Sequence, residues 1–477
     1  MGRLRRAARK VVAHGVDIVG RKLLRRHESW PSSELWGMTV NDRGHLCVSG
    51  HDLVDAAARC GTPLHVVDAV KLERNLSTFL AAFRRHHQRV EVAYSYKTNP
   101  LPGVLDHLHR AGAWAEVISH FELWLAFRLG VPAARIIFNG PGKTAEGLEL
   151  AVSRNIALIN IDGLSEIEAI EKLASKHGVV QRVGVRVITS VGWSEHFGLP
   201  LSTGAAEEAI RRITASPHMS LQGLHLHLGT GIADIGAYLT GVRDLAAFAA
   251  RVQRDTAVRL RYFDLGGGFA APTVRKFSPI DGVLLQHGLP AWPPDLSGDS
   301  LAERHAGDII DALRPAFAEG VEPTVIFEPG RAITGSAQCL LLSVIARKDF
   351  GRQVPAIVLD GGRNIVMPPS WQYHALLPVN KVATPGSSYF DVFGPLCHPG
   401  EMLFRTRWLP DMQPGDLLAV MDAGAYFIPN QMNFSNPRPA AVMVEPEGWR
   451  VIRERESFDD VVRLDLRPDL RRSNWRR

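Results

Sequence analysis

The sequence predicts an α/β protein that joins a (β/α)₈ barrel to a C-terminal antiparallel β domain. The chain of 477 residues is too long for one small core, so two domains are expected. From about residue 62 to residue 326, short apolar runs alternate with stretches of helical apolar spacing. After about residue 335, apolar runs follow one another through turns, without helical stretches between them.

The predicted barrel strands are short runs rich in apolar and β-branched residues. They cover residues 63–68, 90–96, 114–119, 135–140, 157–162, 182–187, 221–229, 261–268 and 324–330. Helical apolar spacing separates them, for example in residues 72–87 and 165–178. A strand-then-helix unit repeated about eight times favours a closed parallel barrel over an open doubly wound sheet.

The remaining segments lie at the two ends of the chain and between the last predicted barrel strands. Residues 272–300 are rich in proline and longer than a normal strand-to-helix connection. The predicted boundaries are 1–34 for a basic N-terminal extension, 35–61 for edge strands that join the β domain, 62–330 for the barrel, 331–460 for the β domain and 461–477 for a basic tail.

Composition and cysteine spacing are those of an ordinary globular protein. Apolar residues make up 45% of the chain and charged residues 22%. The four cysteines are widely spaced and form no CxxC pair, so neither a metal site nor a disulfide framework is indicated. A reducing cytoplasm is therefore the expected location. No apolar run reaches the roughly 18 residues that suggest a membrane-spanning helix.

The formal net charge of +6 is concentrated at the two ends of the chain. The first 26 residues are dense in arginine and lysine, with only Asp17 opposing them. They could form a basic amphipathic helix at an anionic surface, but a solvated extension without membrane contact is favoured. The middle of the chain is close to charge balance, so nucleic-acid binding is not expected as the main function.

Lys97 stands at the tip of a predicted strand. The stretch AYSYKTNP (93–100) alternates in polarity and then meets Pro100, which cannot continue a strand ladder. Such a lysine is either a solvated surface charge or a group held over a pocket, ready to form an imine. Catalytic residues of a barrel lie at the C-terminal ends of the strands. The residues at the other strand ends therefore indicate whether Lys97 is a surface charge or a reactive amine.

Those strand ends carry parts that suit a phosphorylated aromatic aldehyde. The glycine run 266–268 can present backbone N–H groups to phosphate oxygens, and Arg331 can add a forked, charged contact. Glu328 can hold a pyridine nitrogen protonated, and His227 can stack on the ring face. Each part alone has a simpler explanation, but together they favour the reactive role for Lys97.

Six motifs closely resemble the pyridoxal-phosphate decarboxylases with an alanine-racemase-like barrel, a family that includes diaminopimelate, ornithine and arginine decarboxylases. They occur in the same order over about residues 35–450, and NGPGK (139–143) brings the chain nearest the diaminopimelate branch. The motifs are AYSYKTNP (93–100), HLHLGTG (225–231), DLGGGF (264–269), FEPGRA (327–332), FGPLCHPGE (393–401) and MDAGAY (421–426). The resemblance implies a pyridoxal 5'-phosphate cofactor, release of carbon dioxide from an amino acid, and a homodimer with shared active sites.

The resemblance also assigns roles to individual residues. Lys97 resembles the Schiff-base lysine, and His227 resembles the histidine that stacks on the ring. Cys397 resembles the cysteine that protonates the product across the dimer interface; its alternative is a buried small apolar residue. The further cofactor contacts implied are Thr230, in place of the usual serine, with Gly267, Gly268, Glu328, Arg331 and Tyr426.

Three positions depart from the family pattern. His398 follows the cysteine where the family has an acid for a distal ammonium, Met367 stands at an arginine position, and His196 at a lysine position. A histidine cannot replace a carboxylate as the counter-ion of an ammonium. The far end of the substrate is therefore expected to be neutral or anionic, as in acylated or carboxylated diamino acids of siderophore or other specialised pathways. The predicted substrate contacts are His398, Glu401, Arg363 and Tyr373.

Three other functions remain open. The first is diaminopimelate decarboxylase of lysine biosynthesis. The second is an amino-acid racemase on the same barrel, although such racemases need a second base and generally lack the GPxC motif that holds Cys397. The third is a cofactor-free regulator, which the presence of Lys97, His227, Glu328 and Arg331 makes the weakest of the three.

Overall fold

The computed structural model describes residues 30–286, 296, 300–349 and 354–465. Residues 1–29 of the predicted basic N-terminal extension, and residues 466–477 of the predicted basic tail, lie outside this range. The chain divides into two units, which are described separately. The barrel unit comprises Lys71–Pro272 and Gly298–Gly335, and the sheet unit comprises the described parts of Met1–Val70, Thr273–Ser297 and Ser336–Arg477.

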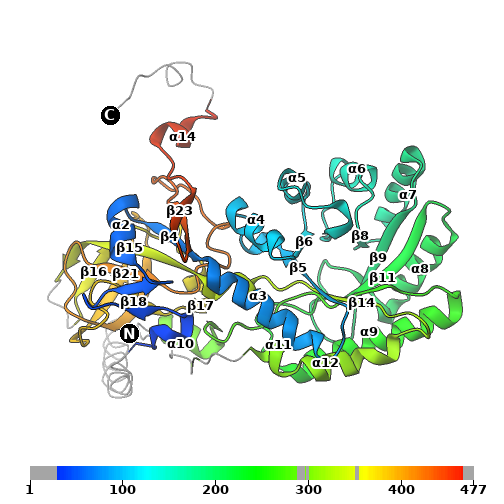
Figure 1. Ribbon diagram of the computed structural model, residues 1–477, viewed down its shortest axis with the longest axis horizontal. Coiled ribbons are helices and arrows are strands. Elements are labelled where there is room, and N and C mark those ends of the chain that lie inside the picture. The colour runs from blue at the N-terminus through cyan, green and yellow to red at the C-terminus, as the bar shows by residue number, and fades with distance from the viewer. Residues whose placement is uncertain (1–29, 287–295, 297–299, 350–353, 466–477) are drawn as a thin grey trace, which may run out of the picture. The chain divides into compact units, whose positions relative to one another are not determined.

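Parallel strands form the closed barrel that was predicted. They are β5 (Val90–Ser95), β6 (Trp114–Val117), β7 (Ile136–Phe138), β8 (Leu158–Ile161), β9 (Gln181–Ile188), β11 (Met219–His225), β12 (Tyr262–Asp264) and β14 (Thr324–Phe327). Each pairs with its neighbour in the order β9-β11-β12-β14-β5-β6-β7-β8, and pairing of β8 with β9 closes the ring. The short β10 (Leu199–Pro200) extends β9. The strands are almost wholly buried, because helices cover their outer side (Figure 1).

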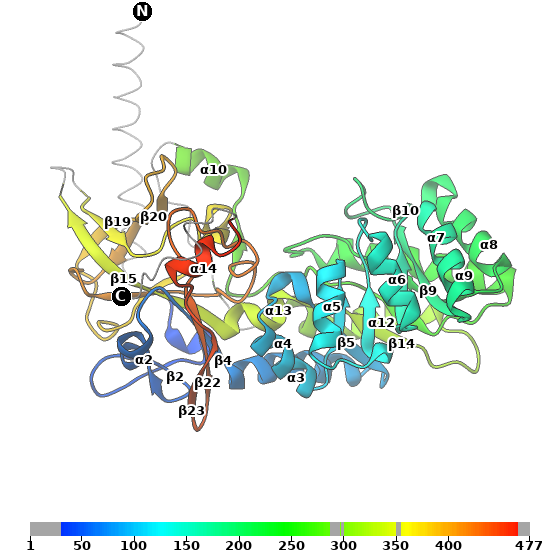
Figure 2. The ribbon, with the colours of Figure 1, turned by 90° about the horizontal axis from the view of Figure 1, so that it is seen from above.

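One helix precedes the first barrel strand, and the others follow the barrel strands in turn. They are α3 (Ala69–Arg84), α4 (Pro102–Arg110), α5 (His120–Arg128), α6 (Ala145–Ser153), α7 (Ser165–His177), α8 (Ala205–Ala215), α9 (Ile235–Thr256), α11 (Leu301–Arg304), α12 (Ala306–Leu313) and α13 (Arg331–Thr334). Side chains of Ser119, Thr144 and Asp234 cap α5, α6 and α9, which explains where these helices begin. Figure 2 shows α5 to α9 arranged around the strands. Across the described part of the chain, no helix has both the length and the apolarity needed to span a membrane.

The sheet unit is built on one large mixed sheet. Its strands are β4 (Leu64–Asp68), β15 (Gln338–Lys348), β16 (Ala356–Leu359), β18 (Leu376–Pro378), β19 (Ser388–Phe393), β20 (Met402–Leu409), β21 (Leu417–Val420), β22 (Ala440–Glu445) and β23 (Gly448–Arg453). Most pairs are antiparallel, as predicted, but β16 with β19 and β22 with β4 are parallel. The long β15 holds the sheet together, because it pairs with three other strands, β4, β16 and β21.

Smaller elements complete the sheet unit. The segment predicted to add edge strands forms its own small antiparallel sheet of β1 (Thr39–Val40), β2 (Leu46–Val48) and β3 (His51–Asp52), followed by α2 (Leu53–Cys60). The proline-rich stretch contributes β13 (Arg275–Lys276), which pairs with β17 (Gln372–Tyr373), and α10 (Pro279–Gln286). The last described helix is α14 (Phe458–Val462).

One predicted strand belongs to a different sheet. Residues 63–68 were expected to open the barrel, but β4 lies between β15 and β22 in the sheet unit. All five residues of β4 are buried, and a continuous apolar run does not reveal which partners will bury it. The barrel therefore begins at β5, and Lys97 follows the first barrel strand rather than the second.

Candidate active site

The carboxyl ends of the barrel strands carry the charged residues predicted for the site. Lys97 lies in the 3₁₀ turn Tyr96–Thr98 directly after β5. Glu328 follows β14, and His227 stands two residues beyond the end of β11. Parallel strands of a barrel end at the same rim. Accordingly, Nδ1 of His227 lies 3.8 Å from Oε2 of Glu328, although the two residues are far apart in sequence.

A buried carboxylate anchors the Lys97 ammonium. Nζ of Lys97 lies 2.8 Å from Oε2 of Glu116 on β6, and Oγ of Ser95 donates to the same oxygen at 2.5 Å. The Glu116 side chain is only 1% exposed, whereas that of Lys97 keeps 31% of its surface. The ion pair with Glu116 thus fixes the lysine, while part of its side chain stays accessible.

Two asparagines connect the carboxylates inside the barrel. Nδ2 of Asn139 donates to Oε1 of Glu116 at 3.1 Å and also to Oε1 of Glu328. Nδ2 of Asn160 donates to Oδ1 of Asn139 at 2.8 Å and to Oδ2 of Asp264 at 3.2 Å. All five side chains are buried. The network therefore fixes the position of Glu328 relative to the anchor of the lysine.

The two acids at the far end of this network differ in protonation. Burial alone would raise the pKa of Glu328, but the neighbouring histidines and the Lys97 charge hold that pKa well below its ordinary value. Burial and the Glu328 charge raise the pKa of Asp264 well above its ordinary value. This environment therefore favours the ionised form of Glu328 and the protonated form of Asp264. An ionised carboxylate in a buried site can hold a protonated ring nitrogen.

The rings of His227 and His225 both lie beside Glu328. Burial lowers the pKa of His227, and the backbone N–H of Gly267 donates to its Nδ1 at 3.3 Å. Nε2 of His225 lies 3.6 Å from Oε2 of Glu328. Neither ring nitrogen of the buried His225 has a hydrogen-bond partner within the described residues. A buried polar ring in this state marks a place where a ligand can supply the partner.

The glycine turn after β12 is built from close backbone contacts. A Cβ on Gly268, whose φ is +83°, would collide with the carbonyl oxygen of Gly229. A Cβ on Gly267 would likewise collide with the carbonyl oxygen of Glu328. Glycine is therefore required for these close approaches. Gly267 is buried and Gly268 is partly exposed, and glycine-rich turns of this kind are suited to phosphate groups.

The other two predicted phosphate contacts differ in exposure. Arg331 begins α13 and is 9% exposed, so its charge lies within the barrel unit. Thr230 is exposed beside the turn that follows β11. A buried guanidinium and an accessible hydroxyl are both chemically suited to phosphate oxygens.

The predicted residues of the sheet unit fall into an exposed group and a buried group. Cys397 and His398 are exposed, which rules out the alternative that Cys397 is a buried apolar residue. Glu401 is only 4% exposed, and its Oε1 accepts the backbone N–H of Arg363 at 3.3 Å. Burial raises the pKa of Glu401. The hydroxyl of the buried Tyr373 meets the Arg407 guanidinium 2.5 Å away.

Tyr426 has an unusual backbone. Its φ is +67°, in the left-handed region that side chains rarely adopt, and its carbonyl oxygen accepts Nδ2 of Asn430 at 2.9 Å. A strained residue of this kind persists only where the surrounding structure holds it, which is common at functional sites.

Five residues of the site were not predicted from the sequence. They are Glu116, Asn139, Asn160, His225 and Asp264. Each is a polar side chain within or directly after a barrel strand, and Asn139, His225 and Asp264 lie inside sequence stretches quoted above without having been assigned a role. Polarity at the C-terminal tips of several barrel strands was the signal that could have identified them.

Comparisons with known proteins find relatives in sequence and in structure. A family model described as "Pyridoxal-dependent decarboxylase, pyridoxal binding domain" matches residues 70–335. A diaminopimelate decarboxylase from Methanothermobacter thermautotrophicus is 30% identical over 433 residues, which is 89% of this chain and 96% of that protein. The diaminopimelate decarboxylase from Aquifex aeolicus is 29% identical, with 89% and 96% covered.

Solved structures agree over most of the chain. The crystal structure of diaminopimelate decarboxylase from Methanocaldococcus jannaschii matches with a TM-score of 0.79 and 27% identity, over 91% of this chain and 98% of that one. The same enzyme in complex with L-lysine matches equally well, with a TM-score of 0.79. A protein from Aquifex aeolicus matches with a TM-score of 0.76 and 28% identity, covering 91% and 99%.

Proposed function

This chain belongs to the pyridoxal-dependent decarboxylase family, and we propose that it removes the α-carboxylate of an amino acid whose far end is not a free ammonium. The reaction class, a carboxy-lyase that uses pyridoxal phosphate, follows from the family. The substrate class rests on one observation. The exposed side chain after Cys397 is His398, whereas the nearest acid, Glu401, is buried.

The residues of the barrel unit fit the cofactor. When bound, pyridoxal phosphate acts as an electron sink that lets the α-carboxylate leave as carbon dioxide. The glycine turn at Gly267 and Gly268 and the guanidinium of Arg331 would hold the phosphate. The ionised Glu328 would hold the ring nitrogen, and the ring of His227 would lie against the cofactor face. Lys97 would make the covalent link.

Glu116 gives Lys97 two properties that this role requires. The carboxylate orients the amine, because the 2.8 Å ion pair leaves Nζ little freedom. It can also take up the proton that the amine must lose before it becomes a nucleophile. Asn139 then couples this event to Glu328, since its amide donates to both carboxylates.

Cys397 is the proposed proton donor to the carbon that loses carbon dioxide. Its thiol is exposed, so it is available to a substrate or to a second subunit. The family resemblance favours a homodimer in which one subunit's Cys397 completes the site of the other. The loop that follows β19 would then bring His398 to the same site, because it is the next residue.

The far end of the substrate would meet His398 rather than Glu401. Both Gly362 and Gly394 lie so close to Oε1 of Glu401 that a Cβ on either would collide with it. Oε1 of Glu401 therefore packs into the sheet unit and supports the turn at Arg363, whereas its buried Oε2 has no hydrogen-bond partner within the described residues. A neutral His398 can hydrogen-bond an amide, and a protonated one can pair with a carboxylate. Acylated or carboxylated diamino acids, as in siderophore pathways, have such ends.

The second candidate is diaminopimelate decarboxylase itself. It is favoured by the near-complete coverage of relatives that carry this name, at 30% and 29% identity. In that case Glu401, or a residue of another subunit, would have to bind the distal ammonium of the substrate.

Borohydride reduction tests the cofactor assignment. The purified protein should absorb visible light, and reduction should fix the cofactor on the peptide that contains Lys97. Lys97→Ala should lose both signals, whereas Lys143→Arg serves as a control for a second barrel lysine. A fixed adduct in Lys97→Ala would disprove the assignment.

Substitution of His398 tests the substrate class. Carbon dioxide release should be faster with a diamino acid acylated at its distal nitrogen than with free meso-diaminopimelate or ornithine. His398→Glu should shift this preference toward the free diamine end, and Glu401→Gln should not. If His398→Ala leaves rapid turnover of free meso-diaminopimelate unchanged and Glu401→Ala abolishes it, the second candidate replaces the first.

A further inference from the structure

Trp193 lies in the loop between β9 and β10, residues 189–198, and keeps 45% of its surface exposed. The same loop holds His196, which stands at a lysine position of the family pattern. A single exposed aromatic side chain is common and means little by itself. The contacts of this indole, however, lead directly to the candidate active site.

The indole of Trp193 lies beside His227 and the turn that follows it. The two ring centres are 6.0 Å apart and the ring planes are inclined by 48°, within the range of interacting aromatic pairs. A Cβ on Gly229 would lie 3.2 Å from Nε1 of Trp193, so the indole rests against the backbone of this turn. The backbone N–H of Trp193 donates to the Leu228 carbonyl at 3.1 Å. Trp193 is therefore joined to three successive residues at the end of β11.

Hydrogen bonds at both ends of the loop hold Trp193 in place. At the first end, the backbone N–H and the hydroxyl of Ser190 donate to Oδ2 of Asp244 at 2.9 Å and 2.5 Å. At the other end, the backbone N–H of Gly198 donates to Oδ1 of Asp162 at 2.8 Å. The Asp162 side chain is only 2% exposed, so water competes little for this bond. The position of the indole is thus set by the loop as well as by its own contacts.

Further rings and a charged group stack behind the indole. The ring of Phe197 lies 5.9 Å from that of Trp193, with only 17° between the planes. The guanidinium carbon of Arg186 lies 4.5 Å from the Phe197 ring centre, and Nη1 of Arg186 lies 3.6 Å from Oδ2 of Asp162. The ring of His196 is 4.0 Å from that of Phe197. The histidine at the family's lysine position therefore adds a ring to this stack.

The other contacts of His227 leave the plane of its ring unfixed. The backbone N–H of Gly267 donates to Nδ1 at 3.3 Å, and Oε2 of Glu328 lies 3.8 Å from the same atom. The torsion that turns a histidine ring has broad minima, so contacts at one atom let the plane tilt. A neighbouring aromatic ring acts on the whole imidazole and can fix its plane.

We propose that Trp193 is a positioning residue that holds the ring plane of His227 for the cofactor. A ring that is already held in place loses less freedom when a ligand binds against it, which strengthens binding. The link to the cofactor rests on the proposed function, in which the His227 ring lies against the cofactor face. The contact between Trp193 and His227 does not depend on that function.

Chemical modification of the cofactor-free protein tests the contact itself. Diethyl pyrocarbonate acylates accessible imidazoles, and mass spectrometry of the peptide that contains His227 gives the rate at this residue. Trp193→Ala should raise that rate at least threefold, because it uncovers the ring. Trp193→Phe should react more slowly than Trp193→Ala, because phenylalanine keeps an aromatic ring there. A smaller rise in Trp193→Ala, or an equal rise in both variants, would overturn the proposal.

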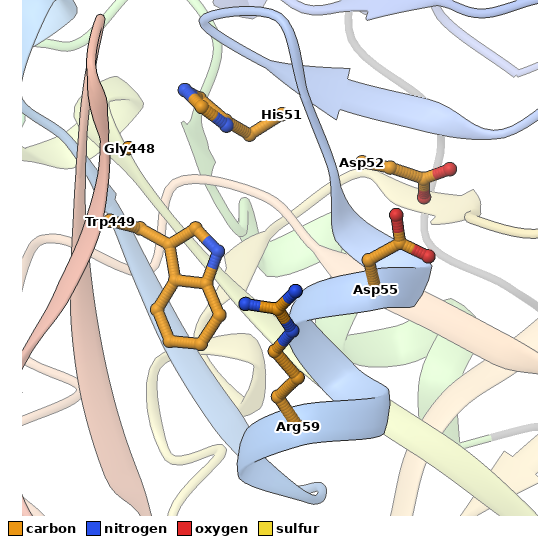
Figure 3. A pocket seen from close by; sticks show the side chains of 6 residues that line it. All are labelled: His51, Asp52, Asp55, Arg59, Gly448 and Trp449. Carbon is orange, nitrogen blue, oxygen red and sulfur yellow. The ribbon is translucent and has the colours of Figure 1, made fainter.

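Two other tryptophans provide matched controls. Trp124 on α5 is 48% exposed and stacks on Phe121, with ring centres 6.1 Å apart. Figure 3 shows Trp449 of the sheet unit with Arg59 beside its indole, and the guanidinium carbon lies 5.8 Å from the ring centre. Trp124→Ala and Trp449→Ala should leave the His227 rate unchanged. A rise in either control as large as that in Trp193→Ala would indicate general loosening and would overturn the assignment to Trp193.

Titration with pyridoxal 5'-phosphate then tests the role toward the cofactor. The cofactor is added to the cofactor-free wild type and variants, and visible absorbance gives the Kd. Trp193→Ala should raise Kd at least threefold, and Trp193→Phe should raise it less. If the wild type binds the cofactor and Trp193→Ala binds it equally well, the positioning role is overturned. If the wild type itself does not bind, the proposed function fails instead, and the modification rates still decide whether Trp193 holds His227.

Discussion

Replacement of Asn139 by leucine tests whether the buried network is held together as described. Leucine has a similar size but no polar atoms, so the change removes hydrogen bonds without opening a large cavity. Asn139 donates to Glu116 at 3.1 Å and to Glu328, and it accepts from Asn160 at 2.8 Å. It is 3% exposed, so water cannot replace these partners.

The loss can be estimated bond by bond. A hydrogen bond to a charged group contributes roughly 1.5–3 kcal/mol, so the two carboxylates together account for about 3–6 kcal/mol. Asn160 keeps its bond to Asp264 at 3.2 Å, so the third bond adds only about 1 kcal/mol. Asn139→Leu should therefore lower the free energy of unfolding by about 4–7 kcal/mol. That is a large part of the roughly 5–15 kcal/mol typical of a domain.

Urea unfolding followed by circular dichroism measures the effect on cofactor-free protein. The matched control is Gln253→Leu, because Gln253 is also buried in the barrel unit but bonds only to backbone groups, Ala316 at 2.8 Å and Leu260 at 3.0 Å. Loss of two neutral bonds should cost about 2 kcal/mol. An Asn139→Leu loss no larger than the Gln253→Leu loss would refute the network.

Three further predictions follow from other parts of the chain. Burial raises the pKa of Glu122 to about 7, so the free energy of unfolding should fall by about 3 kcal/mol as pH rises from 4.5 through 7. Urea unfolding midpoints measured at pH 5 and pH 8 should show this fall in the wild type and a smaller one in Glu122→Gln. Lys143 is fully buried 3.0 Å from Glu166, so Lys143→Met should cost about 3–5 kcal/mol, and adding Glu166→Leu should recover part of it in the same urea assay. Mixed Lys97→Ala and Cys397→Ala subunits should regain part of the activity in a carbon dioxide assay, and no recovery after verified subunit exchange would contradict a shared site.

The barrel could be predicted because its strands repeat a simple pattern. Fully buried parallel strands read as short apolar runs, and helices of regular spacing separate them. The run at residues 63–68 has the same appearance, yet β4 pairs with β15 and β22. Local pattern fixes the type of an element, whereas its partners depend on contacts distant in sequence. The place of β4 could therefore not be derived from the run itself.

The candidate site was predictable where a motif indicates the chemistry of its residues. Lys97 and Glu328 stand in stretches with turn residues that mark strand ends. Asn139 opens the stretch NGPGK (139–143) and Asn160 stands among apolar neighbours, but neither pattern indicates which side chains the asparagine will face. Their partners became visible only when the barrel brought four different strand ends together.

Which of the residues after β19 are exposed could not be predicted from the sequence either. His398 and Glu401 are three positions apart, and either could have faced a ligand. The structure leaves His398 exposed and packs Glu401 against the glycines of two turns. This difference depends on how closely separate backbone segments approach, which no local pattern encodes.

A competition experiment measures whether the enzyme prefers a substrate with a free distal ammonium or one whose distal nitrogen is acylated. Wild-type holoenzyme is given equal concentrations of meso-diaminopimelate and a diamino acid acylated at its distal nitrogen with a dicarboxylic acid. The ratio of the two products at early times gives the ratio of kcat/KM values. We expect at least a tenfold preference for the acylated substrate, because His398 offers no counter-ion for a free ammonium. A preference for meso-diaminopimelate of the same size would contradict it.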